Sequence, residues 1–126
     1  MTKKALITGI AGQDGSYLTE HLLSLGYEVH GIVRRHSVAE NQNHRLHKLN
    51  CNSNLITYYG DLLDYPSLVR IMQEVQPDEI YNLGAMSHVR ISFDMPSFTI
   101  QTNAMGVLNM LEVYRTLCPE AKFYQA

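Results

Sequence analysis

The stretch that decides the fold is KALITGIAGQDGSYL, which runs from Lys4 to Leu18. Its first four residues are a short run that ends near a glycine, which is typical of a buried strand. A helix is predicted over residues 16–25, and Gly26 ends it. The apolar face of that helix consists of Leu18, Leu22 and Leu25. The stretch therefore predicts a strand that turns sharply into a helix.

Three glycines, each separated from the next by two residues, form this turn and suit the binding of a pyrophosphate. The strand must turn sharply, the anion must approach the backbone, and the helix must pack close to the sheet. Free amides at the helix start then face the anion. A glycine turn without a ligand is the alternative, but the strand–helix context favours a phosphate loop. Its predicted residues are Gly9, Ile10, Ala11, Gly12, Gln13, Asp14 and Gly15.

Strands and helices alternate along the rest of the chain. Further strands are predicted over residues 28–33, 55–59, 79–83 and 122–125. Residues 36–53 are polar and predict a long loop with at most a short helix. Strands joined by helical crossovers must pair in parallel, with right-handed connections that cover both faces of the sheet. The predicted fold class is therefore α/β, a doubly wound parallel sheet of the Rossmann type with strand order 3-2-1-4-5.

Two further helices connect the later strands. Asp64 is predicted to cap the first, which ends at Pro77. Its buried side consists of Leu68, Ile71, Met72 and Val75. Asp94 and Pro96 are predicted to open the second helix, which closes near Pro119. The inward residues of this helix are Phe98, Val107, Met110, Leu111 and Tyr114.

Composition places the chain among proteins with one packed domain. It has 126 residues, of which 45% are hydrophobic and 17% charged, with a net charge of −2. This charge predicts no nucleic-acid partner and no anionic membrane surface, and no apolar run reaches the roughly 20 residues of a membrane-spanning helix. Cys51 and Cys118 form no CxxC motif, so a reduced, cytoplasmic chain is expected.

The last predicted strand is followed by no helix within residues 1–126. That strand would lack a covering helix and leave a sheet edge open. The dinucleotide fold also consists of two halves, of which only one and the beginning of the second are present. We therefore expect an incomplete cofactor-binding domain, the front part of a longer protein. A half-domain stabilised by oligomerisation is the alternative.

The end of the second strand indicates the type of dinucleotide. Enzymes that use NAD place an acidic residue about 20 residues beyond the glycines, where it binds the ribose 2′-hydroxyl. Arg34 and Arg35 occupy that place, followed by His36 and Ser37. Guanidinium groups bind phosphate, whereas a carboxylate would repel it. The pair therefore favours NADP; a solvated arginine pair, or one arginine at a subunit contact, is the alternative.

Two more loops follow predicted strands at the edge where open α/β sheets bind ligands. Asp61 can accept a hydrogen bond from the adenine amino group, and Leu62 can cover the ring. The loop after the fourth strand has small residues where a cofactor must pass close to the backbone. It consists of Leu83, Gly84, Ala85, Met86 and Ser87. Ordinary turns are the alternative for both loops.

Together these motifs resemble the extended short-chain dehydrogenase/reductases, and most closely the GDP-mannose 4,6-dehydratase family. The segments that carry the resemblance are ITGIAGQDGSYL, YEVHGIVRRHS, YYGDL, IYNLGAMSHVRISFD and KFYQA. The resemblance implies conversion of GDP-mannose to GDP-4-dehydro-6-deoxy-mannose and water, on the route to GDP-fucose. It implies a homotetramer with tightly held NADP, and it assigns the loops above to the cofactor. It adds Phe98 to the cofactor site, where family members often carry Tyr, as they often carry Gln at Met86.

The family's catalytic residues are a YxxxK pair and a Thr and a Glu, all expected beyond Ala126. Tyr114 and Lys122 do not have the YxxxK spacing, so the chain by itself is predicted to be inactive. An NADP-dependent reductase or epimerase of the same superfamily and an inactive chain that binds NADP or fills a subunit interface are the alternatives. His44 and His47 form an HxxH pair for which a solvated loop is the favoured interpretation. His88 is predicted either to approach a substrate phosphate or to pack against the sheet.

Overall fold

The computed structural model describes residues 2–34, 52–85 and 89–126. Its sheet has the order β3-β2-β1-β4-β5, and every neighbouring pair is parallel, which confirms the predicted fold class and topology. The strands are β1 (Lys4–Thr8), β2 (Glu28–Val33), β3 (Leu55–Tyr59), β4 (Glu79–Asn82) and β5 (Lys122–Gln125). The fourth strand ends one residue earlier than predicted. Of the predicted long loop, only Asn52 and Ser53 belong to the described residues.

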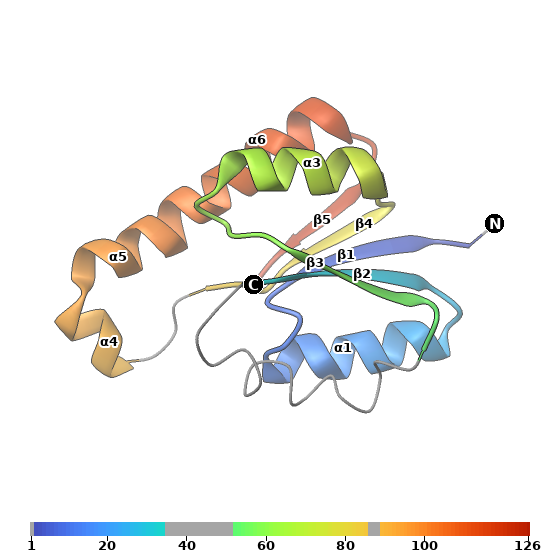
Figure 1. Ribbon diagram of the computed structural model, residues 1–126, viewed down its shortest axis with the longest axis horizontal. Helices are drawn as coiled ribbons and strands as arrows, with labels where there is room; N and C mark the ends of the chain where they lie inside the picture. The colour runs from blue at the N-terminus through green and yellow to red at the C-terminus, as the bar shows by residue number, and fades with distance from the viewer. Residues whose placement is uncertain (1, 35–51, 86–88) are drawn as a thin grey trace.

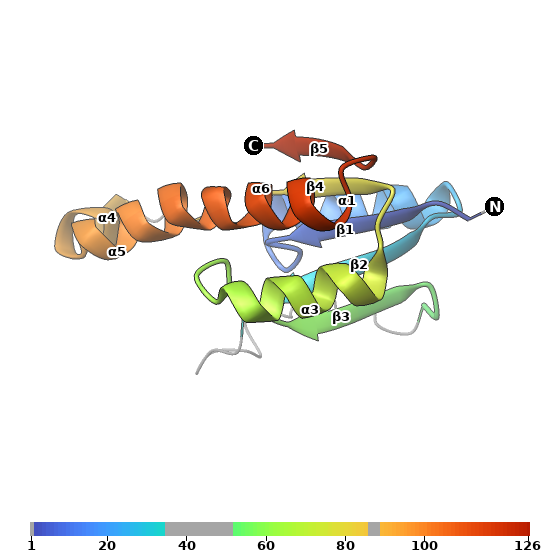
Figure 2. The same ribbon diagram turned by 90° about the horizontal axis from the view of Figure 1, so that it is seen from above.

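The helices form a layer on each side of the sheet. They are α1 (Gln13–Ser24), α3 (Tyr65–Val75), α4 (Val89–Asp94), α5 (Pro96–Ile100), the π-helical segment η2 (Gln101–Met105) and α6 (Gly106–Leu117). Figure 1 shows α3 and α6 on one face and α1 on the other. Seen from above in Figure 2, α4 and α5 extend beyond the carboxyl ends of the strands. The long helix predicted from Pro96 is thus a continuous run of α5, η2 and α6.

Alternate residues of β1 supply both faces of the core. Leu6 packs in the cluster beneath α3 and α6, whereas Ala5 and Ile7 pack in the cluster beneath α1. All three side chains are fully buried. This arrangement explains the unbroken apolar run in the sequence, because a parallel sheet covered on both faces needs apolar residues at successive positions.

The helix α3 confirms its predicted apolar face. Leu68, Ile71, Met72 and Val75 are each 1% exposed. Asp64 does occupy the N-cap position, but its side chain makes no capping hydrogen bond. Instead, the Asp64 carbonyl accepts a hydrogen bond from the Ser67 hydroxyl at 2.7 Å.

Two leucines predicted to face the core are exposed. Leu25 is 60% exposed because α1 ends at Ser24, and Leu111 is 41% exposed. The buried face of α6 is formed by Gly106, Met110 and Val113. Leu111 lies one residue, about 100°, beyond Met110 around the helix, which turns it away from the sheet.

The prediction that Asp94 caps the long helix is wrong. Asp94 is the last residue of α4, a helix that the sequence pattern did not predict, and it accepts a hydrogen bond from Arg90 Nε at 3.0 Å. The N-cap position of α5 belongs to Met95. The carboxylate is therefore used inside the preceding helix.

Truncation of a core leucine tests this packing. We expect Leu6→Ala to lower the free energy of unfolding by about 2–5 kcal/mol, because a fully buried leucine leaves a cavity. Leu25→Ala is the matched control, and its effect should stay within about 0.5 kcal/mol because the side chain is exposed. Urea unfolding of both variants measures the difference, and equal losses would contradict the assignment of Leu6 to the core.

Candidate functional site

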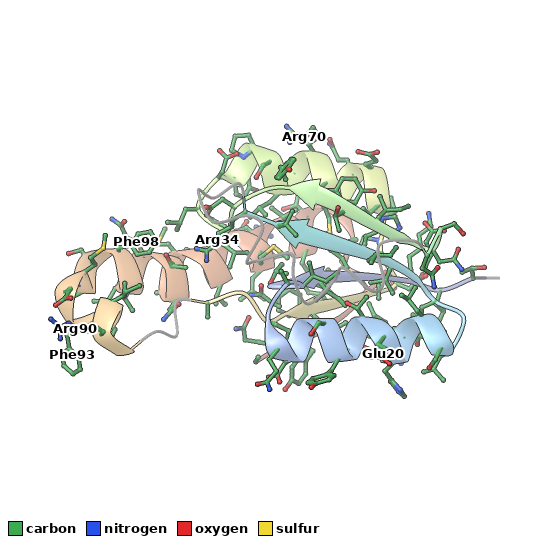
Figure 3. The ribbon with its side chains drawn as sticks, turned by 60° about the horizontal axis from the view of Figure 1, so that its bottom comes forward. Glu20, Arg34, Arg70, Arg90, Phe93 and Phe98 are labelled. Atoms are coloured by element: carbon green, nitrogen blue, oxygen red, sulfur yellow. The ribbon has the colours of Figure 1, made fainter. Side chains whose placement is uncertain are left out.

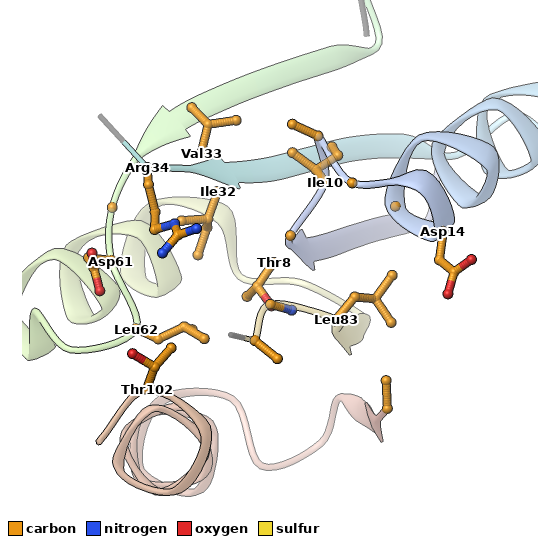
Figure 4. Close-up of a pocket in the computed structure, with 18 of the residues that line it drawn as sticks. Thr8, Ile10, Asp14, Ile32, Val33, Arg34, Asp61, Leu62, Leu83 and Thr102 are labelled. Carbon is orange, nitrogen blue, oxygen red and sulfur yellow. The ribbon is translucent and has the colours of Figure 1, made fainter. Parts of the chain in front are cut away.

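A cleft opens at the carboxyl edge of the sheet, where the loops after β1, β2, β3 and β4 meet (Figure 4). Its volume is about 450 Å³. Its lining residues are Thr8, Gly9, Ile10, Ala11, Gly12, Gln13, Asp14, Gly15, Ile32, Val33, Arg34, Gly60, Asp61, Leu62, Leu83, Gly84, Ala85, Thr102 and Ala126. We call this space the carboxyl-edge cleft. It lies where ligands bind to open α/β sheets.

Gly9 makes the tight turn that starts the loop after β1. Its φ angle is +68°, in the left-handed region that glycine adopts without strain. A Cβ atom at this position would lie 2.9 Å from the Gly84 nitrogen and 3.0 Å from the Gly84 Cα. The loops after β1 and β4 therefore touch backbone to backbone, and a side chain at Gly9 would separate them.

The other two glycines bring the start of α1 close to the same turn. A Cβ atom on Gly15 would collide with the Gly9 carbonyl oxygen and would lie 2.7 Å from the Ile10 Cα. The Gly12 amide donates to the Gly9 carbonyl at 3.0 Å, and Gly12 is the N-cap residue of α1. The amides of the first helical turn have no partner within the helix. These amides therefore lie beside the glycine turn at the cleft, where they can donate hydrogen bonds to a bound anion.

Ile10 holds this loop against β2 in a way that the sequence motif did not reveal. The Ile10 side chain is fully buried. It occupies the space where Gly31 of β2 would carry a Cβ atom, within 3.0 Å of that position. The glycine in β2 thus admits the isoleucine of the loop, and the pair sets the height of the loop above the sheet.

A chain of polar groups, buried at its centre, joins the ends of three strands beneath the cleft. The Gly84 amide donates to Thr8 Oγ1 at 2.9 Å, and the Thr8 hydroxyl donates to Asn82 Oδ1 at 2.6 Å. The Asn82 amide then donates to Gln125 Oε1 at 2.8 Å. Thr8 and Asn82 are 1% and 0% exposed. Because Thr8 and Asn82 are buried and paired, and their bonds to Gly84 and Gln125 are partly buried, the chain fixes the ends of β1, β4 and β5 relative to each other.

Arg34 and the loop after β3 form another wall of the cleft. Figure 4 shows the Arg34 side chain pointing into the space above Thr8. Asp61 Oδ1 accepts the Leu63 amide at 2.9 Å, which holds the loop in a tight turn. The Leu62 carbonyl accepts a hydrogen bond from Asn109 Nδ2 of α6 at 2.8 Å. A guanidinium group, a carboxylate and an apolar side chain thus face one cleft from two neighbouring strands.

The structure brings most of the predicted site residues together. The whole loop from Gly9 to Gly15 lines the cleft, and so do Arg34, Asp61, Leu62 and residues 83–85. Phe98 belongs to α5 and is not among the lining residues. The remaining predicted residues lie outside the described part of the chain and are Arg35, His36, Ser37, Met86 and Ser87.

Several lining residues were missed by the analysis of the sequence. Three of them directly precede a predicted residue, and their adjacency is a signal that could have found them: Thr8, Val33 and Gly60. Ile32 lies two residues before Arg34, in β2. Thr102 and Ala126 have no such signal. Only the packing of η2 and β5 against the other elements brings these two to the cleft.

Other candidate chemistry finds no support in the described residues. Within residues 2–34, 52–85 and 89–126, no group of three His, Cys, Asp or Glu side chains is placed to hold a metal ion. The histidines His44, His47 and His88 lie outside these ranges. Cys118 is buried and free, and burial raises the pKa of its thiol. No helix in the described part of the chain is long and apolar enough to cross a membrane.

The fold and the cleft define a doubly wound α/β protein of the Rossmann type, with a glycine loop between its first strand and helix. Residues 6–126 match the sequence family described as GDP-mannose 4,6 dehydratase. The chain therefore belongs to the GDP-mannose 4,6-dehydratase family.

Individual relatives agree with this assignment. The GDP-mannose 4,6-dehydratase of Vibrio cholerae is 55% identical over 100% of this chain and 35% of its own length. The GDP-mannose 4,6 dehydratase of Homo sapiens is 52% identical over 97% of this chain and 34% of its own length. The chain thus spans about a third of the length of these curated relatives. Among solved structures, the UDP-glucose 4-epimerase of Thermus thermophilus in complex with NAD has a TM-score of 0.74 and 28% identity, covering 90% of this chain and 34% of that one.

Gly9 and Gly26 both have a positive φ angle, but only Gly9 is crowded by a neighbouring backbone. Alanine at the two positions therefore distinguishes the cost of backbone strain from the cost of crowding. Gly26 has a φ of +87° and nothing within 4 Å of a Cβ position, whereas Gly9 has a φ of +68° and Gly84 in contact. We expect Gly26→Ala to cost about 1–2 kcal/mol of stability, from the left-handed backbone alone. Gly9→Ala should cost about 1–3 kcal/mol more, because the methyl group must push Gly84 away. Equal losses in urea unfolding would contradict the backbone contact between the two loops.

Proposed function

We propose that this chain is the cofactor-binding part of an NADP-dependent GDP-mannose 4,6-dehydratase. The observation that carries the proposal is the family match over residues 6–126, which includes every described element of the cleft. Relatives that are more than half identical to the chain bear the name of this enzyme. The similar epimerase from Thermus thermophilus was solved in complex with NAD, which supports a nicotinamide dinucleotide as the ligand of the cleft.

The residues of the cleft fit such a dinucleotide. Gly9 and Gly15 leave no room for side chains, so that the backbone can approach a pyrophosphate closely. The start of α1 supplies amide donors and the positive end of a helix dipole. Leu62 offers an apolar surface to a base, and Asp61 lies beside it with one carboxylate oxygen already bonded to the Leu63 amide.

The reaction implied by the family removes hydride from C4 of the hexose, eliminates water across C5–C6 and returns hydride to C6. The bound nicotinamide would supply the acceptor and donor of that hydride. The residues of this chain bind and orient the cofactor. The polar chain from Gly84 through Thr8 to Asn82 keeps the strand ends, and with them the cleft, in a fixed shape. No YxxxK motif occurs in residues 1–126, so proton transfer from the sugar belongs to other parts of the protein.

Arg34 is the residue proposed to select NADP over NAD. It follows β2 directly, lines the cleft and is exposed there, so its guanidinium is free to meet a phosphate. Figure 3 shows that Arg70, an exposed arginine on α3, lies elsewhere on the molecule. Arg70 is not among the residues that line the cleft.

These two arginines provide a matched test of cofactor selection. We expect Arg34→Ala to weaken NADPH binding by about 10- to 100-fold, because a charge-assisted hydrogen bond contributes about 1.5–3 kcal/mol. NADH binding should change little, since NADH has no 2′-phosphate. Arg70→Ala removes the same charge away from the cleft and should leave both affinities unchanged. Titration calorimetry measures all four values, and equal weakening of NADPH and NADH would refute the 2′-phosphate contact.

The activity is tested on the whole protein with GDP-mannose as substrate. We expect NADP-dependent formation of GDP-4-dehydro-6-deoxy-mannose, detected by mass spectrometry as a loss of water. UDP-glucose is the control substrate, because the similarity to a UDP-glucose 4-epimerase makes epimerisation the alternative activity. Epimerised product without loss of water would favour that alternative. The 126-residue chain by itself should show no turnover, and turnover by it would refute the absence of catalytic groups.

A homotetrameric assembly and a cytoplasmic location are also part of this proposal. The first derives from the family resemblance and the second from the cysteine pattern, and both stay predictions. Sedimentation of the whole protein measures the first directly.

A further inference from the structure

The hydroxyl of Thr102 is left without a partner in a place where polar groups are normally paired. Thr102 is 6% exposed. Among the described residues, its Oγ1 is the one buried side-chain nitrogen or oxygen atom that has no hydrogen-bond partner. Leaving a buried hydroxyl unpaired is unfavourable, so such a group in a native structure calls for a physical reason.

Two other helical threonines show what this hydroxyl would ordinarily do. The Thr19 hydroxyl donates to the Gly15 carbonyl at 2.7 Å, and the Thr99 hydroxyl donates to the Met95 carbonyl at 3.0 Å. Both bonds run to the residue four positions earlier, the common partner of a threonine in a helix. Thr102 makes no such bond, although it lies in the same continuous helical run as Thr99.

The missing local bond coincides with a change in helix geometry. Thr102 is the second residue of this segment, and the Gly106 amide at its end bonds to the carbonyl of Gln101, five residues earlier. Single π-helical turns of this kind occur frequently at functional sites.

Thr102 faces the carboxyl-edge cleft beside the loop after β3. It is one of the lining residues, and Figure 4 shows its side chain pointing from the helix toward Asp61 and Leu62. One turn further along, Gly106 packs so closely on Leu62 that a Cβ atom would lie 2.9 Å from the Leu62 Cβ. The glycine loop, which follows β1, lies on the other side of the cleft. Thr102 is therefore at the end of the cleft opposite this predicted phosphate loop.

We propose that Thr102 binds the base end of the dinucleotide through its hydroxyl group, an inference that rests on the proposed function. Leu62 covers one face of the base, and the neutral hydroxyl suits a ring nitrogen or a ribose oxygen rather than a phosphate. Rotation about χ1 exchanges the hydroxyl and methyl positions, and a helical threonine populates both rotamers. The bound ligand then supplies the hydrogen-bond partner that the Thr102 hydroxyl lacks within the helix.

Replacement by valine isolates the hydroxyl, because the two side chains have nearly the same shape. In the whole protein freed of cofactor, Thr102→Val should weaken NADPH, NADH and adenosine 2′,5′-bisphosphate by similar factors of about 3 to 10, the effect of one neutral hydrogen bond. Its melting temperature without ligand should stay the same or rise, since no hydrogen bond is lost. Thr102→Ser keeps the hydroxyl and should bind all three ligands as the unmodified protein does.

Thr99→Val is the matched control, because Thr99 is in the same helical run but already bonds to Met95. It should leave the three affinities unchanged. The proposal is overturned if Thr102→Val binds like the unmodified protein, or if it lowers only the melting temperature. Weaker NADPH binding with unchanged adenosine 2′,5′-bisphosphate binding would overturn the assignment to the base end. An unmodified protein that binds none of the three ligands would instead refute the proposed function itself.

Discussion

The structure depends on one close approach, in which the loop after β1 is held between α1 and the loop after β4. Gly9 faces Gly84 on one side, and Gly15 faces the Gly9 carbonyl and Ile10 on the other. No side chain fits at either contact, so both positions are tied to glycine by space, and Gly9 also by its positive φ angle. Since the strand end, the helix start and the neighbouring loop meet here, the shape of the cleft follows from this contact.

Buried and partly buried hydrogen bonds extend that constraint across the sheet. The chain from Gly84 through Thr8 and Asn82 to Gln125 connects residues more than 40 positions apart in the sequence. On the other side, Asn109 of α6 bonds to the Leu62 carbonyl and fixes the loop after β3. A ligand in the cleft therefore meets strand ends that are already positioned, so that little ordering is needed when it binds.

The family assignment and the cleft support each other but concern different parts of the chemistry. The match over residues 6–126 identifies the family, and the glycine loop and Arg34 explain how this part of the protein would hold a cofactor. Thr102 adds a feature that belongs to this chain's own packing, since its hydroxyl lacks the local partner that Thr19 and Thr99 have. The proposal therefore assigns cofactor binding to the residues described above and the reaction on the sugar to other residues.

The sequence by itself determined the sheet order and most of the cleft, because both depend on local patterns. The apolar run before Gly9, the glycine spacing and the position of Arg34 relative to β2 are readable within short segments. Tertiary structure alone decided which face of α6 is buried, so that Val113 and not Leu111 meets the core. It also decided that Ile10 fits over Gly31 and that Thr102 reaches the cleft. These outcomes depend on contacts between segments distant in the chain and on a π-helical turn, and neither leaves a periodic signal in the sequence.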